Sequence, residues 1–414
     1  MALIVQKYGG TSVGSIERII NVARKVKARA QEGHQLVVVL SAMAGMTDRL
    51  IALAHEISPE PDPRELDVLL TTGEQQSVAL FCMAAQEMGL KAHSLLGFQA
   101  GLLTNQRYGR ARIEMVEAMR IKELLDQGQV VVVAGFQGLD VNTGDVTTLG
   151  RGGSDTTAVA LAAALKADVC EIYTDVAGVY TTDPNIVPQA RKLDKISYEE
   201  MLELASLGAK VLEIRSVEFA AKFGVKIHVR SSFSDEEGTM VLGEEHIDER
   251  LLITGVAYSK NEARITIKGL ADQPGVASKV FGPVSQAGIV VDVIIQNTSE
   301  DGVTDISFTV PRTDYEKTMR IMNAVAPEIG AQKVLGDPHI AKVSIVGIGM
   351  RNHAGVATRM FSALAAEGIN IQTINTSEIK VSCVIEEKYT ELAVRVLHEA
   401  FNLGDDHPPR SEDD

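Results

Sequence analysis

"VQKYGGTSVGS" occupies Val5–Ser15 and places a lysine, a glycine pair and two hydroxyl residues directly after a short apolar run. The run predicts a buried strand, with Lys7 at its carboxyl end. Gly9 and Gly10 have no Cβ, so their backbone can approach an anion closely. A helix that begins near Ser15 would direct its free N–H groups to the same place. The order is not that of a P-loop, whose lysine follows the second glycine. The stretch therefore predicts either a phosphoryl-binding turn or a tight turn with a solvated lysine.

The composition is typical of a globular protein without a surface for nucleic acid or anionic membranes. The chain has 414 residues, of which 45% are hydrophobic, and a net charge of -15; this length favours about three domains. Cys82, Cys170 and Cys383 lie far apart and form no C-x-x-C pair, which favours a reducing compartment over a disulfide framework or a zinc cluster. The histidines also lack ligand spacing, so no transition metal is expected. No signal peptide or apolar run of membrane-spanning length is visible, and we expect a bacterial-type cytoplasmic protein.

Short apolar runs alternate with amphipathic segments up to about residue 230. The runs are Leu36–Leu40, Val130–Ala134, Val169–Thr174 and Val225–Val229. The segments with helical character are Ile16–Gln31, Gln75–Met88, Ile113–Gln127 and Thr156–Lys166. This alternation predicts an open, mostly parallel α/β sheet covered by helices on both faces. Ligands in such sheets bind at the carboxyl ends of the strands. An acidic, turn-rich linker follows at Ser234–Arg250.

The last third of the chain contains an internal repeat. Gly269–Ile294 aligns with Gly347–Ile374 without a gap across the matching core, and each copy reads strand, turn, helix, strand. The first copy continues as a βαββαβ unit through Asp305–Val310, Asp314–Val325 and Gln332–Leu335. The second copy stops after its helix, Tyr389–Phe401, and we expect Leu252–Tyr258 to supply its last strand. The acidic, proline-bearing end of the chain is expected to be disordered.

Two further segments carry chemistry. In Thr147–Leu165, three glycines surround Arg151 just before a predicted helix. The planar fork of Arg151 suits a carboxylate, whereas Ser154 and Asp155 are suitable N-caps, and a well-capped helix alone would explain those two residues. Tyr173–Leu193 follows a buried strand and is rich in turn residues. It is either a long surface loop or part of a binding site, because long loops in compact domains are usually functional or disordered.

In this order, the motifs resemble the amino-acid kinase family and, within it, the aspartokinases. The matching stretches are "KYGGTSVGS", "SAMAGMTDRL" (Ser41–Leu50), "TTGEQQS" (Thr71–Ser77), "GRGGSDTTA" (Gly150–Ala158), "YTDVAGVYTTDP" (Tyr173–Pro184) and "LASLGAKVL" (Leu204–Leu212). The C-terminal repeat resembles the paired ACT modules of those enzymes. The resemblance implies a catalytic domain over residues 1–245 and ferredoxin-like ACT domains over 264–337 and 338–403, the second completed by 251–259. Residues 404–414 would form the acidic tail.

The resemblance also implies a reaction and a set of site residues. ATP, with Mg²⁺, would phosphorylate the β-carboxylate of L-aspartate to 4-phospho-L-aspartate, the first step toward lysine, threonine and methionine. Lys7 would stabilise the γ-phosphoryl group, Asp155 would orient Lys7, and Arg151 and Glu74 would bind the carboxylate and the ammonium of the substrate. The implied aspartate-binding residues are Ser41, Thr47, Glu74, Arg151, Gly152, Gly153 and Ser154. The implied ATP-binding residues are Lys7, Tyr8, Gly9, Gly10, Thr174, Asp175, Tyr180, Asp183 and Lys210. No metal site belonging to the protein itself is expected, because Mg²⁺ arrives with ATP.

Feedback regulation is expected from the ACT modules. The turns that precede their helices would bind lysine, threonine or both, and pairing of the modules would make a homodimer or larger assembly. The expected effector-binding residues are Asp272, Gly275, Val276, Ala277, Asp292, Gln296, Val356, Ala357, Asn370, Ile371, Ser377 and Glu378. One departure from the family pattern is visible: Asn185 stands where relatives carry an arginine that approaches the nucleotide.

Other function classes fit less well. A kinase for glutamate or acetylglutamate would share the fold but would not normally carry two ACT modules. A regulatory protein with a silent kinase domain is disfavoured by the intact Lys7, Glu74, Arg151 and Asp155. A dinucleotide dehydrogenase is disfavoured because "GIGMRN" at Gly347 lacks the third glycine of its fingerprint. The length disfavours a fused homoserine dehydrogenase.

Overall fold

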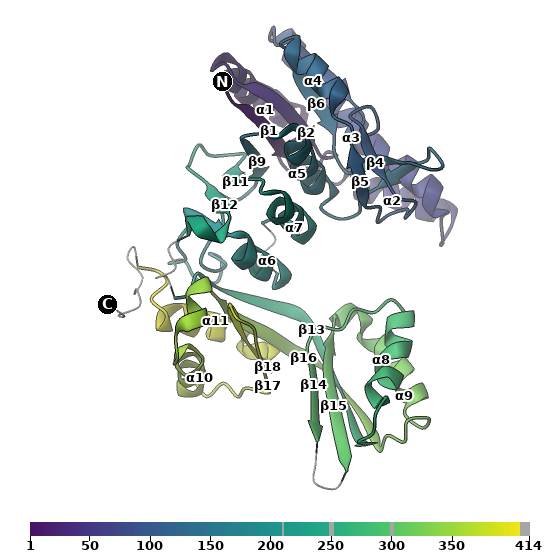
Figure 1. Cartoon of the computed structure of the whole chain (residues 1–414), viewed down its shortest axis with the longest axis vertical. Helices are drawn as coiled ribbons and strands as arrows, with labels where there is room; N and C mark the ends of the chain where they lie inside the picture. Colours follow the sequence, from purple (N-terminus) through teal and green to yellow (C-terminus); the bar gives the residue numbers. More distant parts are fainter. Residues whose placement is uncertain (209–210, 248–251, 299–301, 406–414) are drawn as a thin grey trace. The chain divides into compact units, whose positions relative to one another are not determined.

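The computed structural model describes residues 1–208, 211–247, 252–298 and 302–405, which form two compact units (Figure 1). Among these residues, the first unit contains 1–180, 192–206 and 211–247. The second contains 181–191, 207–208 and the described residues from 252 onward. Most of the acidic tail, expected to be disordered, lies outside the described residues.

An eight-stranded sheet forms the centre of the first unit, in the order β10-β12-β11-β9-β1-β2-β6-β3. Its strands are β1 (Leu3–Tyr8), β2 (Gln35–Leu40), β3 (Ala92–Leu95), β6 (Val130–Ala134), β9 (Val169–Thr174), β10 (Lys195–Ser197), β11 (Ile227–Ser231) and β12 (Thr239–Leu242). Every pairing is parallel except that of β11 with β12. The predicted open, mostly parallel sheet is confirmed, and β1, whose end carries Lys7, lies between β9 and β2.

Helices cover both faces of this sheet. Ile4 and Tyr8 of β1 belong to a core that also contains residues of α1 (Ile16–Gln31) and α3 (Pro63–Glu87). Lys7 points to the other face, because successive strand residues alternate, and that face carries α5. The other α-helices of this unit, including α5, are α2 (Met46–Ile57), α4 (Met119–Asp126), α5 (Gly153–Leu165), α6 (Tyr198–Ser206) and α7 (Ile214–Phe223). No helix in the described part of the chain is both long and apolar enough to cross a membrane.

A second, small sheet in this unit was not foreseen. It has the order β5-β4-β7-β8, built from β4 (Leu102–Thr104), β5 (Ile113–Val116), β7 (Gln137–Asp140) and β8 (Val146–Thr148). The predicted helix over Ile113–Gln127 is therefore wrong in its first part, where β5 pairs antiparallel with β4. Cross-strand pairing decides the structure of such a short segment more than its own amphipathic pattern does.

The second unit is built on a six-stranded sheet, in the order β14-β15-β13-β16-β18-β17. Its elements are β13 (Gly255–Ala271), α8 (Val276–Gln286), β14 (Ile294–Thr298), β15 (Val303–Val310), α9 (Tyr315–Val325), β16 (Lys333–Val346), α10 (Val356–Ala366), β17 (Thr373–Thr376), β18 (Lys380–Glu386) and α11 (Thr390–Ala400). The long strands β13 and β16 pair with each other and contribute to two cores, one beneath α8 and α9 and one beneath α10 and α11 (Figure 1). Gly255–Ser259 pairs with 342–346, beside β18 of the second copy.

A segment from the middle of the chain, Thr181–Arg191, packs within this second unit and is called the inserted segment here. Its Val187 is 5% exposed and belongs to the core beneath α10 and α11. The Thr181 carbonyl accepts a 2.7 Å hydrogen bond from Val256 N–H, and Thr181 Oγ1 lies 2.9 Å from His398 Nε2. The expected turn-rich loop after β9 thus becomes part of a hydrophobic core.

Candidate active site

Lys7 is fixed at the carboxyl end of β1 by an ion pair. Its Nζ lies 2.6 Å from Asp155 Oδ1, and both side chains are only 12% exposed. Asp155 lies in the first turn of α5, which begins after Gly152 in a left-handed conformation with φ 69°. The prediction that Ser154 or Asp155 caps this helix is wrong, because the N-cap is Gly152. Asp155 is consequently available to hold Lys7 between the sheet edge and the helix N-terminus.

The glycine pair lies directly against the loop that follows β2. A Cβ on Gly10 would be 2.8 Å from the carbonyl oxygen of Ala42, so no larger residue fits there without a shift. The Gly10 carbonyl accepts a hydrogen bond from Ala44 N–H at 3.1 Å, and the Tyr8 carbonyl accepts one from Ser41 N–H at 3.2 Å. The turn that carries Lys7 and the loop that carries Ser41 therefore form one surface.

Glu74 brings a buried carboxylate to the same loop. Its side chain lies on α3 and the residue is 3% exposed; its Oε1 accepts a 3.0 Å hydrogen bond from Ala42 N–H. Its Oε2 has no hydrogen-bond partner among the described residues. Burial raises the pKa of Glu74 to about 7. A buried carboxylate with an unused oxygen is suited to bind a cation.

Arg151 is exposed in the short loop between β8 and α5, Leu149–Gly152, which is called the Arg151 loop here. Gly150 and Gly152 both have positive φ, 79° and 69°. Arg151 itself makes no ion pair or hydrogen bond with the described residues, so its guanidinium is available to a ligand. Glycines at both neighbouring positions allow this tight turn, which explains the pattern seen in the sequence.

The end of β9 meets the glycine turn. Gly9 N–H lies 3.4 Å from the Tyr173 carbonyl, which puts Thr174 next to that turn. Thr174 Oγ1 donates to Asp175 Oδ1 at 3.1 Å.

Two other predicted site residues lie elsewhere in the first unit. Tyr180 forms an isolated β-bridge with Lys192. Thr47 is half-buried in the first turn of α2.

Two residues expected at the nucleotide belong to the inserted segment or lie outside the described part of the chain. Asp183 accepts hydrogen bonds from Asn185 N and Nδ2, at 2.9 and 3.0 Å, and from Tyr258 Oη at 3.1 Å. These contacts lie within the second unit. Lys210 lies outside the described residues. The contacts of Asp183 and Lys210 with ATP stay predictions.

One supporting turn was missed from the sequence. Gly135 and Phe136 follow β6, and Phe136 has a positive φ of 71°. A Cβ on Gly135 would be 2.7 Å from Ser154 Oγ, and Phe136 N–H donates to Thr157 Oγ1 at 3.1 Å. The two residues therefore support the first turn of α5. The signal was present in "VVVVAGFQG", a glycine directly after an apolar strand, as in "VQKYGG".

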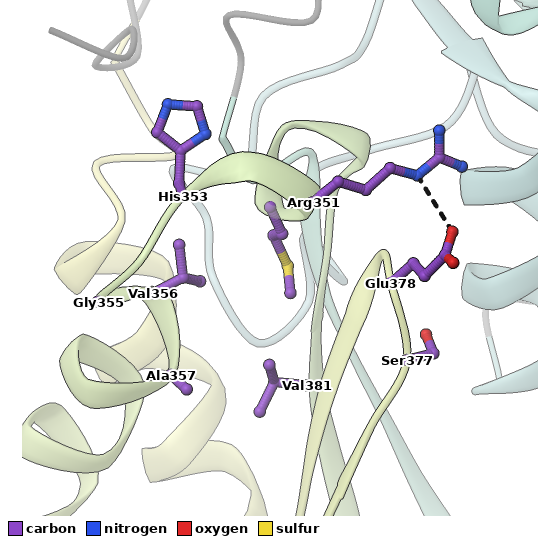
Figure 2. Close-up of a pocket in the computed structure, with 9 residues that line it drawn as sticks. Arg351, His353, Gly355, Val356, Ala357, Ser377, Glu378 and Val381 are labelled. Atoms are coloured by element: carbon purple, nitrogen blue, oxygen red, sulfur yellow. Dashed lines mark ion pairs between the residues drawn. The ribbon is translucent and has the colours of Figure 1, made fainter. Parts of the chain in front are cut away.

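A cavity of about 480 Å³ lies beside the N-terminus of α10 in the second unit (Figure 2). It contains four of the expected effector-binding residues, together with others not foreseen. The lining residues are Met350, Arg351, His353, Gly355, Val356, Ala357, Ser377, Glu378 and Val381. Arg351 Nε lies 3.7 Å from Glu378 Oε2 (Figure 2). Both charge signs are therefore present, as a zwitterionic ligand would require.

The other expected effector-binding residues lie elsewhere in this unit. Gly275, Val276 and Ala277 form the start of α8, the counterpart of α10, and Asp272 is exposed just before them. Asp292 forms an ion pair with Lys342, which also lies 3.1 Å from Glu262. The remaining three do not line the cavity: Gln296, Asn370 and Ile371. Among the described residues, no three His, Cys, Asp or Glu side chains gather as metal ligands would.

Comparison with known proteins supplies the family. The profile of the "Amino acid kinase family" matches residues 2–231, and an "ACT domain" profile matches 265–325 and 343–401. An aspartate kinase of Pseudomonas putida is 59% identical over 411 residues, covering 99% of each chain. An aspartokinase of Corynebacterium glutamicum is 52% identical over 408 residues, covering 98% of this chain and 97% of the relative.

Solved structures agree with this. The structure described as E. coli aspartokinase III in complex with aspartate and ADP (R-state) has a TM-score of 0.81 and 28% identity, covering 97% of this chain and 100% of that one. Its counterpart in complex with lysine and aspartate (T-state) has a TM-score of 0.76, also at 28% identity, with 97% and 99% coverage. The chain is a kinase that belongs to the amino-acid kinase family and, within it, to the aspartokinases with C-terminal ACT domains.

Proposed function

We propose that this protein transfers the γ-phosphoryl group of ATP to the β-carboxylate of L-aspartate, which gives 4-phospho-L-aspartate. The observation that carries the proposal is the position of Glu74. Its unpartnered, buried carboxylate shares the Ala42 loop with the glycine turn of Lys7. An ammonium group bound at Glu74 would therefore lie beside the place where the sheet edge and the α5 N-terminus attract a phosphoryl group.

Lys7 is assigned the role of stabilising the transferring group. Phosphoryl transfer requires positioning and electrostatic stabilisation of charge on the phosphoryl oxygens. The ion pair with Asp155 holds the Lys7 ammonium in one place before the substrates arrive. Gly9 and Gly10 leave the backbone at this turn without side chains that would block the phosphates. Mg²⁺ would arrive with ATP, bound to its phosphate oxygens, and would neutralise part of their charge.

The two ends of the amino acid are assigned to opposite charges. Glu74 would bind the ammonium, and the free guanidinium of Arg151 would bind a carboxylate in a bidentate manner. The β-carboxylate is then the nucleophile: one of its oxygens bonds to the γ-phosphorus as the bond to the β–γ bridging oxygen breaks, and ADP leaves with that electron pair. No proton is transferred, because a carboxylate is already ionised at neutral pH.

The direct test is a coupled assay of ADP formation by the native protein with aspartate, glutamate and acetylglutamate in turn. We expect turnover with aspartate, trapping of the product by hydroxylamine as a hydroxamate, and little turnover with the longer acids. Comparable turnover of glutamate would show that the substrate assignment is wrong. No ADP formation with any of the three would favour a regulatory protein with a silent kinase domain.

The pH dependence of aspartate binding should report on Glu74. Because burial raises its pKa to about 7, the carboxylate that attracts the ammonium is mostly present above pH 7 and is lost as the pH falls below it. We expect KM for aspartate to be nearly constant above about pH 8 and to rise toward roughly tenfold per pH unit below about pH 6.5. Initial rates at saturating Mg-ATP would measure this.

Glu74→Gln should raise KM for aspartate and remove its dependence on pH between these values, since the amide does not titrate. Glu87→Gln is the matched control, because Glu87 is exposed at the end of the same helix. A profile in Glu74→Gln that still follows the native one would assign the titration to another group.

We further propose that lysine, threonine or both inhibit the enzyme by binding to the ACT modules. The cavity beside α10 supports this, because Glu378 offers a carboxylate, and the α10 N-terminus and Arg351 offer positive charge to an amino acid's carboxylate. The E. coli relative solved with lysine supports lysine as one effector. Such a ligand inhibits only if it prefers the less active arrangement of the chain, with a coupling of about 1–3 kcal/mol.

Ser377→Ala and Asp272→Ala should relieve inhibition and leave uninhibited kcat near the native value. Ser377 lines the cavity, and Asp272 precedes the corresponding helix of the first copy. We expect the concentration for half-inhibition to rise by roughly five- to 150-fold if the whole coupling is lost. Ser285→Ala, an exposed position on α8, is the control. Unchanged sensitivity in both variants, tested with lysine and threonine singly and together, would remove these residues from the site.

The proposed organisation is a catalytic domain over 1–245 and two ACT domains over 264–337 and 338–403. The pairing of Gly255–Ser259 with 342–346 supports completion of the second by 251–259. The sheet of the second unit ends in β14 and β17, whose outer edges have no strand partner among the described residues. Free edges favour pairing with another copy, which supports a homodimer or larger assembly. A cytoplasmic location is proposed because ATP and aspartate are available there.

A further inference from the structure

Asp67 is a buried carboxylate whose side-chain hydrogen-bond partners all lie outside its own helix. It lies on α3 and is 1% exposed. Its oxygens accept Gly109 N–H at 3.0 and 2.9 Å, Thr148 N–H at 2.8 Å and Thr148 Oγ1–H at 2.7 Å. A buried carboxylate is costly unless it is hydrogen-bonded, and this one holds two segments together, the end of β8 and the turn at Gly109.

Both segments support the Arg151 loop. Thr148 directly precedes it, and the Thr148 carbonyl accepts a 2.9 Å hydrogen bond from Ala111 N–H. Gly109 packs directly against this loop, because a Cβ on Gly150 would be 2.8 Å from the Gly109 carbonyl oxygen. Asp67 therefore fixes the start of the Arg151 loop and the turn on which that loop rests.

Arg215 also contacts the same two segments, through their backbone carbonyls. It lies on α7, and its Nη1 donates to the Leu149 carbonyl at 2.6 Å while its Nη2 donates to the Ala111 carbonyl at 3.0 Å. Asp67 thus accepts backbone N–H groups, and Arg215 donates to backbone carbonyls, of the same pair of segments. The loop is held by two charged side chains of opposite sign, one on each of two helices.

The helix of Asp67 also carries Glu74. They are seven positions apart, which is about two turns, so both lie on one face of α3, separated by roughly 10 Å along its axis. Both are buried. One rigid helix therefore connects the residue proposed to bind the ammonium with the loop proposed to bind the carboxylate. A fixed distance between these two charges is what selects an amino acid by its length.

We propose that Asp67 and Arg215 are positioning residues that set the distance between Arg151 and Glu74 and thereby select a short dicarboxylic amino acid. Neither residue is assigned a contact with the substrate. The inference rests on the proposed function, since it concerns the same substrate site.

Asp67→Asn tests this with little change in volume. In asparagine an NH₂ group replaces one of the two acceptor oxygens and would face the N–H group of Gly109 or Thr148. At least one hydrogen bond is then lost, and the Arg151 loop is released. We expect KM for aspartate to rise by roughly tenfold or more, with kcat and KM for ATP changed by less than about threefold. Turnover of glutamate relative to aspartate should increase. Amide hydrogen exchange in residues 147–153 should become faster without any substrate present.

Asp140→Asn is the matched control. Asp140 is also fully buried, but it accepts its hydrogen bonds from Asn142 and Thr143 within its own turn. This variant should keep native exchange at 147–153 and a native KM for aspartate. Arg215→Lys, at a half-buried position, keeps the charge but loses the two-pronged contact, and it decides the question if Asp67→Asn does not fold.

The outcomes separate the two proposals. If the native protein does not phosphorylate aspartate, the proposed function is wrong, whereas the exchange measurement still tests how the loop is held. If folded Asp67→Asn and Arg215→Lys both keep the native KM for aspartate and native exchange, the positioning role is wrong. A fall in kcat together with a rise in KM for both aspartate and ATP, of the same size in these variants and in the control, would also overturn it. Such a result would indicate general destabilisation.

Discussion

Lys7→Met should lower kcat by at least about a hundredfold, the scale of removing one preorganised electrostatic contact from a transition state. KM for aspartate should change much less, because Lys7 is assigned to the transferring group and not to either end of the amino acid. The variant also leaves Asp155 without its partner at 2.6 Å, beside the proposed phosphate site. Its negative charge would then repel the group that Lys7 attracted, and this repulsion adds to the loss in kcat. Steady-state kinetics with Mg-ATP and aspartate measure both constants.

Lys122→Met provides the control, since Lys122 is exposed on α4. Its kinetic constants should equal the native ones. Asp155→Asn should lower kcat by less than Lys7→Met does, because the lysine charge remains but is less firmly held. An unchanged kcat with a raised KM in Lys7→Met would contradict the proposed role and would assign Lys7 to ground-state binding.

Arg151→Ala should weaken aspartate binding by roughly 30- to 700-fold, the equivalent of about 2–4 kcal/mol for a lost charge-assisted, bidentate contact. Binding of ATP should change little, because the loop is assigned to the amino acid. Arg151 is exposed and has no partner among the described residues, so its removal should not destabilise the fold. Isothermal titration with aspartate and with a non-hydrolysable ATP analogue separates the two affinities.

Arg107→Ala is a suitable control, because Arg107 is an exposed arginine in a neighbouring loop. Arg151→Lys should recover only part of the affinity, since a lysine cannot form the two parallel hydrogen bonds of a guanidinium. Equal weakening of ATP and aspartate in Arg151→Ala would indicate that the loop serves both substrates.

The central strands and the glycine turn could be predicted because their signals are local. The strands at Val130–Ala134 and Val169–Thr174 and the helix at Ile16–Gln31 have the bounds that the sequence predicted. Buried parallel strands are continuous apolar runs, and Ser15 accepts a hydrogen bond from Arg18 N–H as an N-cap should. Lys7 and Glu74 follow from the motifs, and the structure brings both to the loop after β2.

Features that depend on distant partners could not be predicted. Asp67 is one acidic residue in an amphipathic helix, and its sequence neighbours give no sign that its partners are Gly109 and Thr148. Phe136 has its positive φ where it packs closely against Gly153, and its own sequence gives no sign of this contact. The short strand β5 is stabilised by pairing with β4, although its own amphipathic pattern favours a helix. In each case the deciding contact is long-range, whereas periodicity and capping report only on nearby residues.

The inserted segment has a consequence for anyone who divides or recombines this chain. A single cut near residue 250 would leave Thr181–Arg191 on the catalytic fragment and would remove Val187 from the core beneath α10 and α11. The isolated C-terminal fragment would expose that apolar surface and would lack the carbonyl that accepts Val256 N–H. A chimera that exchanges the ACT modules between relatives should therefore exchange Thr181–Arg191 with them. The boundary between the two units therefore cannot be drawn at a single position in the sequence, because the second unit includes a segment from within the sequence of the first.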